Sequence, residues 1–476
     1  MSEPSELCYL SAAEALRLFR SRELSPVELM QAVIARAEAV EPTINAFAET
    51  FYPSALAQAR AAEARYAGGA GQPRPLDGLP VAVKEEAPIA GQLNTLGSLP
   101  LRDVVADHTA VFVQRIIDAG GIVHARTTTP EFSCAPVTWT KLWGVTRNPW
   151  NTAYSPGGSS GGSAAALAAG TTTLATGSDI GGSIRIPSSF CGVVGFKPPY
   201  GRVPEMEVFN LDHYCHEGPM ARTVADCALL ENVIAGPDPS DVASLRPKLE
   251  IPGRLEPVSG MRIAFSPHLG CYDVDEDVAA NTRAAADRLR DAGAIVQEVT
   301  LPWQLEMIEQ AARIHFGMIF GPSVREIFEQ HAAEMTSYAQ RFVADSAQIG
   351  KDDFVAGLEL EGRIYAPLGA LLADFDALIC PTFAIPALPA EYDVADPLAV
   401  NGRPCADWMD VLMTLPFNIA SRCPVLSVPS GRSRDGVPTG LSIVGKTYDD
   451  VTAFRIAAAH EERFPWLDQA ARRPAL

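Results

Sequence analysis

The chain has 476 residues, of which 47% are hydrophobic and 20% are charged, and its formal net charge at pH 7 is −19. This composition is typical of a globular enzyme. A nucleic-acid binder normally presents a basic face, and a membrane helix needs roughly 20 consecutive apolar residues, a length that no apolar run in the chain approaches. We therefore expect neither a nucleic-acid partner nor a membrane.

The nine cysteines are scattered along the chain, with no C-x-x-C pair and no spacing typical of a zinc site. Such a set indicates reduced thiols. The first six residues, MSEPSE, are acidic and lack the form of a signal peptide. We expect a cytoplasmic protein that uses no metal and no other cofactor.

The first 65 residues are predicted to be helices that pack on the rest of the chain. Residues 25–28 (SPVE) form a capping-box pattern with proline at the first helical position, and apolar residues follow at helical spacing. Residues 67–78 are rich in glycine and proline and predict a loop. The apolar run 79–83 predicts a buried strand, which places Lys84 at its end.

Short apolar strands then alternate with helices. A helix over 109–120 precedes a strand at 121–125, and a strand at 262–265 precedes a helix over 276–291. Three further apolar runs, at 376–381, 424–429 and 440–445, predict strands near the C-terminus, and the Pro/Asp/Ser-rich segment 235–261 predicts a surface excursion. We expect one α/β domain over 1–476, with a central mixed, mostly parallel twisted sheet flanked by helices on both faces.

The most informative stretch is 155–192, inside a predicted catalytic core of residues 79–200. It holds two Gly-Gly-Ser clusters, separated by a small-residue helix at 163–169 and a strand at 172–176. A Gly/Ser-rich segment is usually a flexible linker. Here the flanks are apolar and ordered, so a built turn is favoured. Gly181-Gly182-Ser183 can direct successive backbone N–H groups at one point, as an oxyanion hole requires.

A nucleophilic serine needs a base, and none of the eight histidines lies in a motif for that role. His213 and His216 lie in a loop-like segment, where a structural or substrate-loop role is favoured. Of the 38 basic residues only six are lysine. Arginine cannot lose its proton in a protein, whereas a buried lysine can. Lys84, at the end of a buried strand, is therefore a candidate base.

The stretch from Gly157 to Pro187 resembles the signature of the amidase signature family, and the likeness continues through 191–198. Residues 83–86 with 94–98 are similar to the family's lysine segment, and 418–445 resemble its C-terminal strands. The resemblance covers most of the chain. It implies the amidase signature fold and hydrolysis of amides through an acyl-serine.

The resemblance also implies the site residues. Ser183 matches the nucleophile, Ser159 the serine that follows a cis peptide bond and relays the proton, and Lys84 the base. The implied oxyanion donors are the backbone N–H groups of Ile180, Gly181, Gly182 and Ser183. Ser160 is a candidate to hold Lys84 in place, and Asp179 and Arg185 are supporting structural residues.

The sequence departs from the family pattern at two places. Lys84 is followed by Glu85-Glu86, where the family commonly has Asp, and Ser442 stands where many members have Gln. Two other motifs are decoys. Residues 440–447 satisfy the P-loop pattern but are predicted to be a strand. Residues 158–162 satisfy the nucleophile-elbow pattern, which would make Ser160 the nucleophile, but no strand precedes them.

We expect a monomeric or homodimeric hydrolase of small-molecule amides, whose chemistry would also serve esters or carbamates. The alternatives are a glutaminase subunit of an RNA-dependent amidotransferase complex and an inactive binding protein on the same fold. Pocket residues are expected from the loop after Lys84 and from segments 203–216, 303–330 and 405–420. A bulky or aromatic, uncharged substrate is favoured by the aromatic candidates Trp143, Phe209, Tyr214, Phe316, Phe320 and Trp408.

Overall fold

A computed structural model describes residues 4–69, 71–205, 208–467 and 469–476. Residues 1–3 of the predicted N-terminal helical region, and residues 206–207 of a predicted pocket segment, lie outside these ranges. In the described part, no helix is long and apolar enough to cross a membrane.

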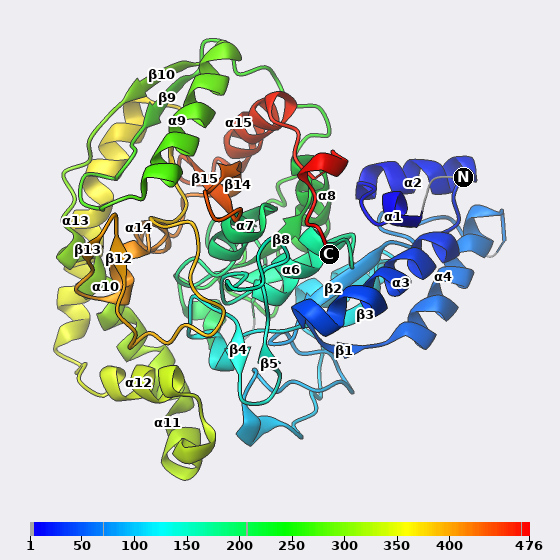
Figure 1. Ribbon diagram of the computed structural model, residues 1–476, viewed down its shortest axis with the longest axis horizontal. Coiled ribbons are helices and arrows are strands. Elements are labelled where there is room, and N and C mark those ends of the chain that lie inside the picture. The colour runs from blue at the N-terminus through cyan, green and yellow to red at the C-terminus, as the bar shows by residue number, and fades with distance from the viewer. Residues whose placement is uncertain (1–3, 70, 206–207, 468) are drawn as a thin grey trace.

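The N-terminal region is helical, as predicted, and it carries one short strand. Figure 1 shows its helices in blue at one end of the long axis. Ser25 caps the third helix, and Glu28 completes the capping box by accepting the backbone N–H of Ser25 at 2.8 Å. The elements are α1 (Pro4–Leu7), α2 (Ala12–Ser21), α3 (Pro26–Ile44), β1 (Phe47–Thr50) and α4 (Tyr52–Tyr66).

The predicted catalytic core supplies the middle of the sheet. The strand before the lysine ends at Lys84 itself, and the small-residue helix begins at Gly161, inside the first Gly/Ser cluster and two residues before its predicted start. The elements are β2 (Pro80–Lys84), α5 (Val111–Asp118), β3 (Ile122–Thr127), β4 (Trp139–Thr140), β5 (Gly144–Val145), α6 (Gly161–Ala169), β6 (Leu174–Ser178), α7 (Arg185–Cys191), β7 (Val194–Lys197), β8 (Glu217–Ala221) and α8 (Val224–Ile234).

The predicted surface excursion 235–261 contains no helix or strand. The elements after it are β9 (Arg262–Phe265), α9 (Glu276–Asp291), β10 (Ile295–Glu298), α10 (Leu305–Met318), α11 (Phe320–His331), α12 (Ser337–Ser346), α13 (Asp353–Asp374), β11 (Ala377–Pro381), β12 (Ala399–Val400), β13 (Arg403–Pro404), α14 (Leu415–Ile419), β14 (Val425–Arg432), β15 (Pro438–Gly445) and α15 (Asp450–Arg463). Helices α10–α13 lie at the opposite end from the N-terminal helices in Figure 1.

One 11-stranded mixed sheet runs through the chain, in the order β1-β3-β2-β6-β8-β7-β14-β15-β11-β9-β10. The predicted fold class is confirmed, but the predicted predominance of parallel pairing is not found. Strands pair in parallel in β3-β2-β6 and β11-β9-β10, whereas the centre and β1 pair antiparallel. A local helix–strand alternation does not reveal that β7, β8, β14 and β15 enter the sheet in alternating directions.

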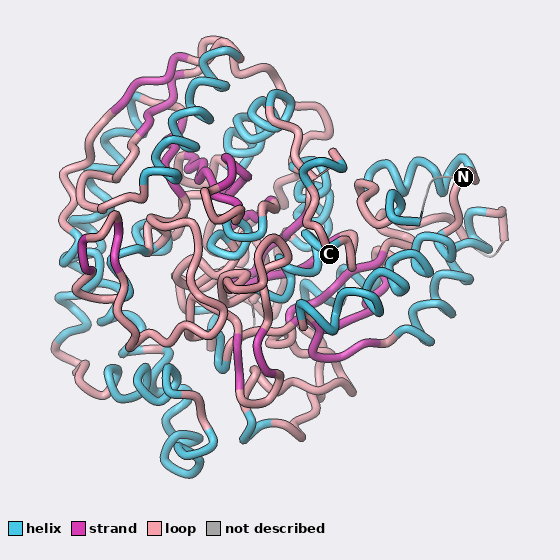
Figure 2. Tube along the Cα trace, viewed as in Figure 1, coloured by secondary structure: helices cyan, strands magenta, loops and turns pink. Residues whose placement is uncertain are grey.

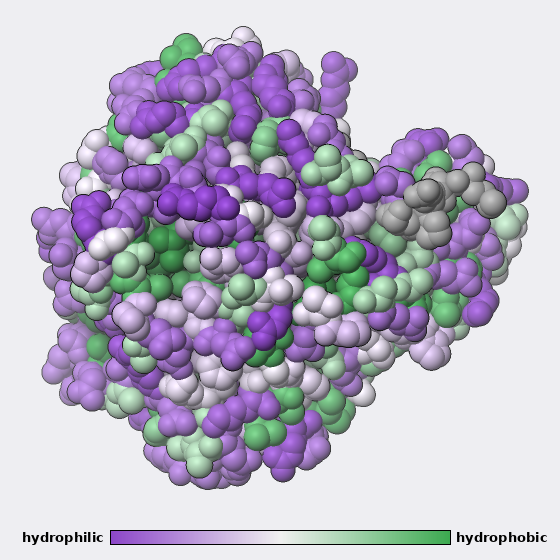
Figure 3. All heavy atoms as spheres, in the orientation of Figure 1, coloured by the Kyte–Doolittle hydropathy of each residue, from purple (hydrophilic) through white to green (hydrophobic). Residues whose placement is uncertain are grey.

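Both faces of the sheet are covered by hydrophobic core. In β11, Ile379 packs into the cluster that contains α8, α9 and α15 residues, while its neighbours Leu378 and Cys380 pack into the cluster that contains α7, α10 and α13 residues. This alternation is the one expected of successive strand residues. Figure 2 shows long loops crossing the middle of the molecule. The face in Figure 3 is mostly hydrophilic, with separate hydrophobic patches.

Candidate active site

Lys84 is positioned by two parallel strands. Its side chain is 1% exposed, and its backbone N–H donates to Oγ1 of Thr176 on β6 at 3.1 Å. Its side-chain nitrogen donates to Oγ of Ser159 at 2.6 Å and to Oγ of Ser178 at 2.8 Å. The structure therefore brings together Lys84 and Ser159, the predicted base and proton relay. Ser178 was not predicted, and it contacts the lysine where Ser160 was expected to.

Ser159 lies in the turn before α6, after a cis peptide bond from Gly158. A Cβ atom at residue 158 would lie 2.5 Å from the carbonyl oxygens of Ala135 and Val137, so only glycine fits this approach of backbone to backbone. Ser160 ties the turn to the second Gly/Ser cluster. Its N–H donates to the carbonyl of Ser183 at 3.1 Å, and its hydroxyl donates to the carbonyl of Ser178 at 3.4 Å.

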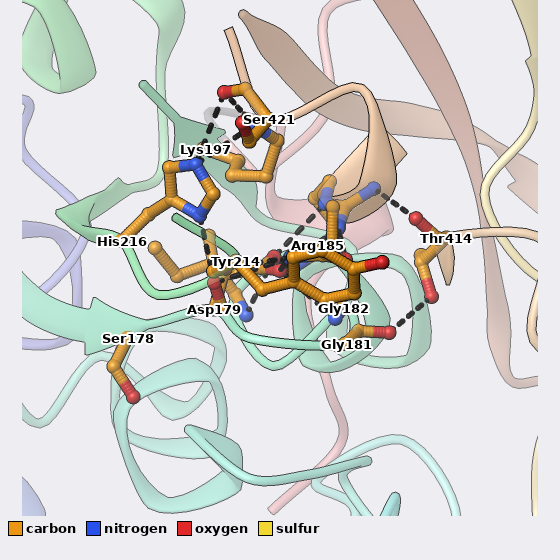
Figure 4. A network of polar contacts seen from close by, with 12 residues as sticks. Ser178, Asp179, Gly181, Gly182, Arg185, Lys197, Tyr214, His216, Thr414 and Ser421 are labelled. Atoms are coloured by element: carbon orange, nitrogen blue, oxygen red, sulfur yellow. Dashed lines mark hydrogen bonds and ion pairs between the residues drawn. The ribbon is translucent and has the colours of Figure 1, made fainter. Parts of the chain in front are cut away.

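Asp179 organises the turn that carries Ser183. Its carboxylate is fully buried and accepts the backbone N–H of Gly182 at 2.8 Å. It also forms an ion pair with the buried guanidinium of Arg185 at 2.8 Å and accepts from Asn418 at 2.9 Å. Figure 4 shows Asp179 beside Arg185 and the turn of Gly181 and Gly182. The expected structural role of Asp179 and Arg185 agrees with this geometry.

The charge of Asp179 is stabilised inside the protein. Burial alone would raise the pKa of Asp179, but the charge of Arg185 and the hydrogen bonds from Arg185 and Asn418 outweigh burial and hold that pKa well below its usual range. Arg185 continues to the carbonyl of Thr414, and the Thr414 hydroxyl donates to the carbonyl of Gly181 at 2.6 Å. The turn is thus fixed from both sides by a charged network.

One expected oxyanion donor is already engaged. Because the N–H of Gly182 donates to Asp179, it is not free to receive a substrate oxygen. Among the described residues, the N–H groups of Ile180, Gly181 and Ser183 have no acceptor. Gly182 has φ 126°, and a Cβ there would lie 2.3 Å from Oγ1 of Thr414, so the position requires glycine.

The two glutamates after Lys84 do different things. Glu85 is buried and accepts the N–H groups of Thr95 and Gly97, so it fixes the loop that follows β2. Burial raises the pKa of Glu85 to about 7. Glu86 turns the other way, and its Oε1 forms an ion pair with the Lys84 nitrogen at 2.8 Å. Of the two residues that depart from the family pattern, Glu86 therefore contacts the predicted base.

A mostly apolar cavity opens at Ser183. Ser183 itself is 8% exposed. Apart from the site turns, the walls are mostly aromatic or aliphatic: Ala135, Pro136, Ile186, Phe316, Phe320, Phe342, Trp408, Leu412 and Leu415. Three of the aromatic candidates named from the sequence are among them. Phe209 lines a second cavity, which opens at Ser159 and Ser178. Trp143 and Tyr214 line neither cavity.

His213, His216 and His315 make structural contacts. His216 is buried between the carbonyls of Asp179 and Ser421, at 3.0 and 3.1 Å, and burial together with the Lys197 charge lowers its pKa to about 3. Within the described chain, Asp212, His213 and His315 are the group whose ligand atoms lie close enough to hold a metal. They are already paired, His315 with Asp212 at 2.6 Å and His213 with Glu361 at 3.0 Å. This polar network links the loop before β8 to α10 and α13.

The secondary structure does not fit either of the two decoy motifs. Residues 440–445 of the P-loop pattern lie in β15, and Ser442 is buried there against the hydroxyl of Thr382 at 2.9 Å. Residues 155–160 before α6 are not a strand, so the strand that a nucleophile elbow requires is missing from this described segment.

Comparison with known proteins agrees with this fold. A family model described as Amidase matches residues 28–454. The chain is 33% identical to an acylamidase of Rhodococcus erythropolis over 97% of both chains. It is 35% identical to a glutamyl-tRNA(Gln) amidotransferase subunit of Synechococcus sp. (strain CC9605), over 93% of this chain and 94% of that one.

Solved structures give the same result. A bacterial aryl acylamidase of the amidase signature enzymes superimposes with a TM-score of 0.89, at 29% identity over 96% of this chain and 97% of that one. A 6-aminohexanoate cyclic dimer hydrolase superimposes with a TM-score of 0.82, at 30% identity over 98% and 99%. Fold and site thus define an enzyme of the amide-hydrolysing class. The chain belongs to the Amidase family, whose enzymes carry the amidase signature.

Proposed function

We propose that this protein hydrolyses amides of small molecules through an acyl-serine formed on Ser183. The observation that carries the proposal is the buried contact of 2.6 Å between the Lys84 nitrogen and Ser159 Oγ, beside the turn that holds Ser183. A base, a relay hydroxyl and a second hydroxyl at the mouth of a cavity are the parts that acyl transfer needs.

In the proposed reaction, neutral Lys84 takes the proton of Ser159 while Ser159 takes the proton of Ser183. The Ser183 oxygen attacks the amide carbonyl, and the backbone N–H groups of Ile180, Gly181 and Ser183 stabilise the oxyanion. Collapse breaks the C–N bond, and the proton returns through Ser159 to the departing amine. Water then attacks the acyl-serine by the same route and releases the acid.

The cavity at Ser183 supports a substrate with an apolar, preferably aromatic group. Glutamine, the ammonia donor of an amidotransferase, carries a carboxylate and an ammonium that need charged partners, and this cavity is walled mainly by apolar side chains. We therefore rank the glutaminase role second, although relatives named as amidotransferase subunits are similar over most of the chain. Esters and carbamates are further candidate substrates because they pass through the same acyl-serine.

The test is a panel of aryl and alkyl amides, esters and carbamates, with glutamine, assayed on the protein purified alone. We expect turnover of aryl or other apolar amides by the isolated protein, and its loss in both Ser183→Ala and Lys84→Ala. Full activity in either variant would exclude the proposed chemistry. Glutamine hydrolysis that appears only with added amidotransferase subunits would favour the second candidate.

A further inference from the structure

The environment of the Lys84 nitrogen contains a third oxygen besides the two serine hydroxyls. Ser159 Oγ lies at 2.6 Å, Ser178 Oγ at 2.8 Å and Glu86 Oε1 at 2.8 Å. An ammonium has three N–H groups, whereas a neutral amine has two. The two hydroxyls accept hydrogen bonds from the nitrogen, and the Glu86 carboxylate places a negative charge within ion-pair distance of it, which favours the ammonium.

Glu86 is held in this position by Ser133, which lines the same cavity. Ser133 donates its hydroxyl to Oε2 of Glu86 and contacts the hydroxyl of Thr129 at 2.9 Å. Phe132 and Ser133 have φ values of 52° and 56°. Two consecutive residues other than glycine in the left-handed region are unusual, and such conformations are kept where the surroundings determine them. The carboxylate is thus anchored on a strained segment and is not a mobile surface charge.

Glu86 is the carboxylate that contacts the Lys84 nitrogen, and several other charged or titratable groups lie around this pair. Burial alone would raise the pKa of Glu86, but the Lys84 charge and the hydrogen bond from Ser133 outweigh it and lower that pKa. Burial and the charges of Glu205 and Glu86 raise the pKa of Glu217 well above its usual range. The remaining groups that face the pair or its strand are Glu85, His108, Arg126, Glu205 and Cys215.

Glu205 interacts with Glu217, and the other four groups act elsewhere. Glu85 points to the backbone of Thr95 and Gly97, and Arg126 donates to the backbone carbonyls of residues 84, 85 and 87. Burial raises the pKa of the Cys215 thiol well above its usual range, so this group stays neutral. His108 forms an exposed pair with Asp107.

We propose that Glu86 is a positioning residue that holds Lys84 as an ammonium in the free enzyme and so sets the pH above which Ser159 and Ser183 are activated. The proposal rests on Lys84 acting as the base of the proposed hydrolysis. An opposite charge at this distance moves the pH at which a neighbouring group loses its charge by about 1–3 units. Removal of the Glu86 charge then makes the neutral amine available at lower pH.

The experiment follows Ser183 without needing the natural substrate. The rate of labelling by a fluorophosphonate probe is measured from pH 6 to 10 for the wild type, Glu86→Gln and Glu86→Asp. We expect the acid limb of the profile to move to lower pH by about one unit or more in Glu86→Gln. Glu86→Asp should keep the wild-type limb, because it keeps the charge, and should label more slowly because the shorter side chain holds Lys84 less well.

Glu462→Gln is the matched control, because it removes a glutamate whose side chain is 77% exposed. Circular dichroism and thermal unfolding establish that each variant is folded, and Glu86→Ala, which also removes the charge, provides the second variant if Glu86→Gln does not fold. A Glu86→Gln limb that coincides with the wild-type limb, or an equal shift in Glu462→Gln, overturns this inference alone. A folded wild-type protein that is not labelled at any pH overturns the proposed function and this inference with it.

Discussion

The backbone N–H of Gly182 donates to Oδ1 of Asp179 at 2.8 Å, inside the turn that leads to Ser183. The same carboxylate is paired with Arg185 and is fully buried. A charge that is shielded from water in this way must keep its partner, because an unpaired buried charge is strongly destabilising. Asp179 thus couples the shape of the nucleophile turn to the stability of the protein.

Replacement of Asp179 by Asn should therefore cost both stability and activity. The guanidinium of Arg185 would remain buried without its counter-ion, so we expect a loss of roughly 3–5 kcal/mol in the free energy of unfolding. Urea unfolding followed by circular dichroism measures the loss. Asp287→Asn is the control, because its pair with Arg290 is exposed and should contribute less than about 1 kcal/mol. Equal losses in the two variants would contradict the account.

The two glycines before Ser183 should respond differently to alanine. In Gly182→Ala the new Cβ would lie 2.3 Å from Oγ1 of Thr414 at φ 126°, so we expect a loss of roughly 1–3 kcal/mol and loss of turnover. In Gly181→Ala the nearest atom is Cζ of Phe316 at 3.4 Å, which is ordinary contact at the edge of the cavity.

Gly181→Ala should therefore fold with nearly wild-type stability and raise KM most for bulky substrates. Thermal unfolding and steady-state kinetics on a small and a large amide separate the two effects. A stable, fully active Gly182→Ala would show that the turn does not need glycine there.

Lys197 predicts a particular dependence of stability on pH. Burial, with the charge of Arg185, lowers the pKa of Lys197 to about 7, whereas an unfolded lysine has a pKa of about 10.4. Between these values the unfolded chain binds a proton that the folded chain does not, so this group makes stability rise with pH. Below pH 7 the cost of charging the buried amine is fully present.

The variant Lys197→Met removes this group, so the difference in unfolding free energy, wild type minus variant, should rise from pH 7 to pH 10. The slope is at most about 1.4 kcal/mol per pH unit. Urea unfolding at several pH values gives the difference directly. A difference that stays flat or falls with rising pH would show that Lys197 is charged in the folded protein throughout this range.

The sequence predicted the elements that bear the site but not all of their contacts. Lys84, Ser159 and Ser183 follow from a long motif and its resemblance to a family. The contact of Ser178 with Lys84 depends on the parallel register of β2 on β6, in which Val81 lies beside Leu174, and no local pattern specifies that register. The engagement of Gly182 by Asp179 likewise depends on the exact path of the turn.

The direction of the strands was the other feature that local patterns did not predict. Alternating helices and strands suggested mostly parallel pairing, yet β14 and β15 form an antiparallel hairpin and β7 and β8 pair antiparallel. Strand direction is decided by how distant segments meet. Glu86 was noticed as a departure from the family pattern, but only the folded strand end shows that it faces Lys84 while Glu85 faces the following loop.

The most direct test of the account is the position of the covalent adduct that a fluorophosphonate probe forms at neutral to alkaline pH. Intact-mass measurement followed by peptide mapping should find one adduct, on Ser183, which is absent in Ser183→Ala and forms much more slowly in Lys84→Ala. An adduct on Ser160, or an adduct that persists in Ser183→Ala, would contradict the assignment of Ser183 as the nucleophile.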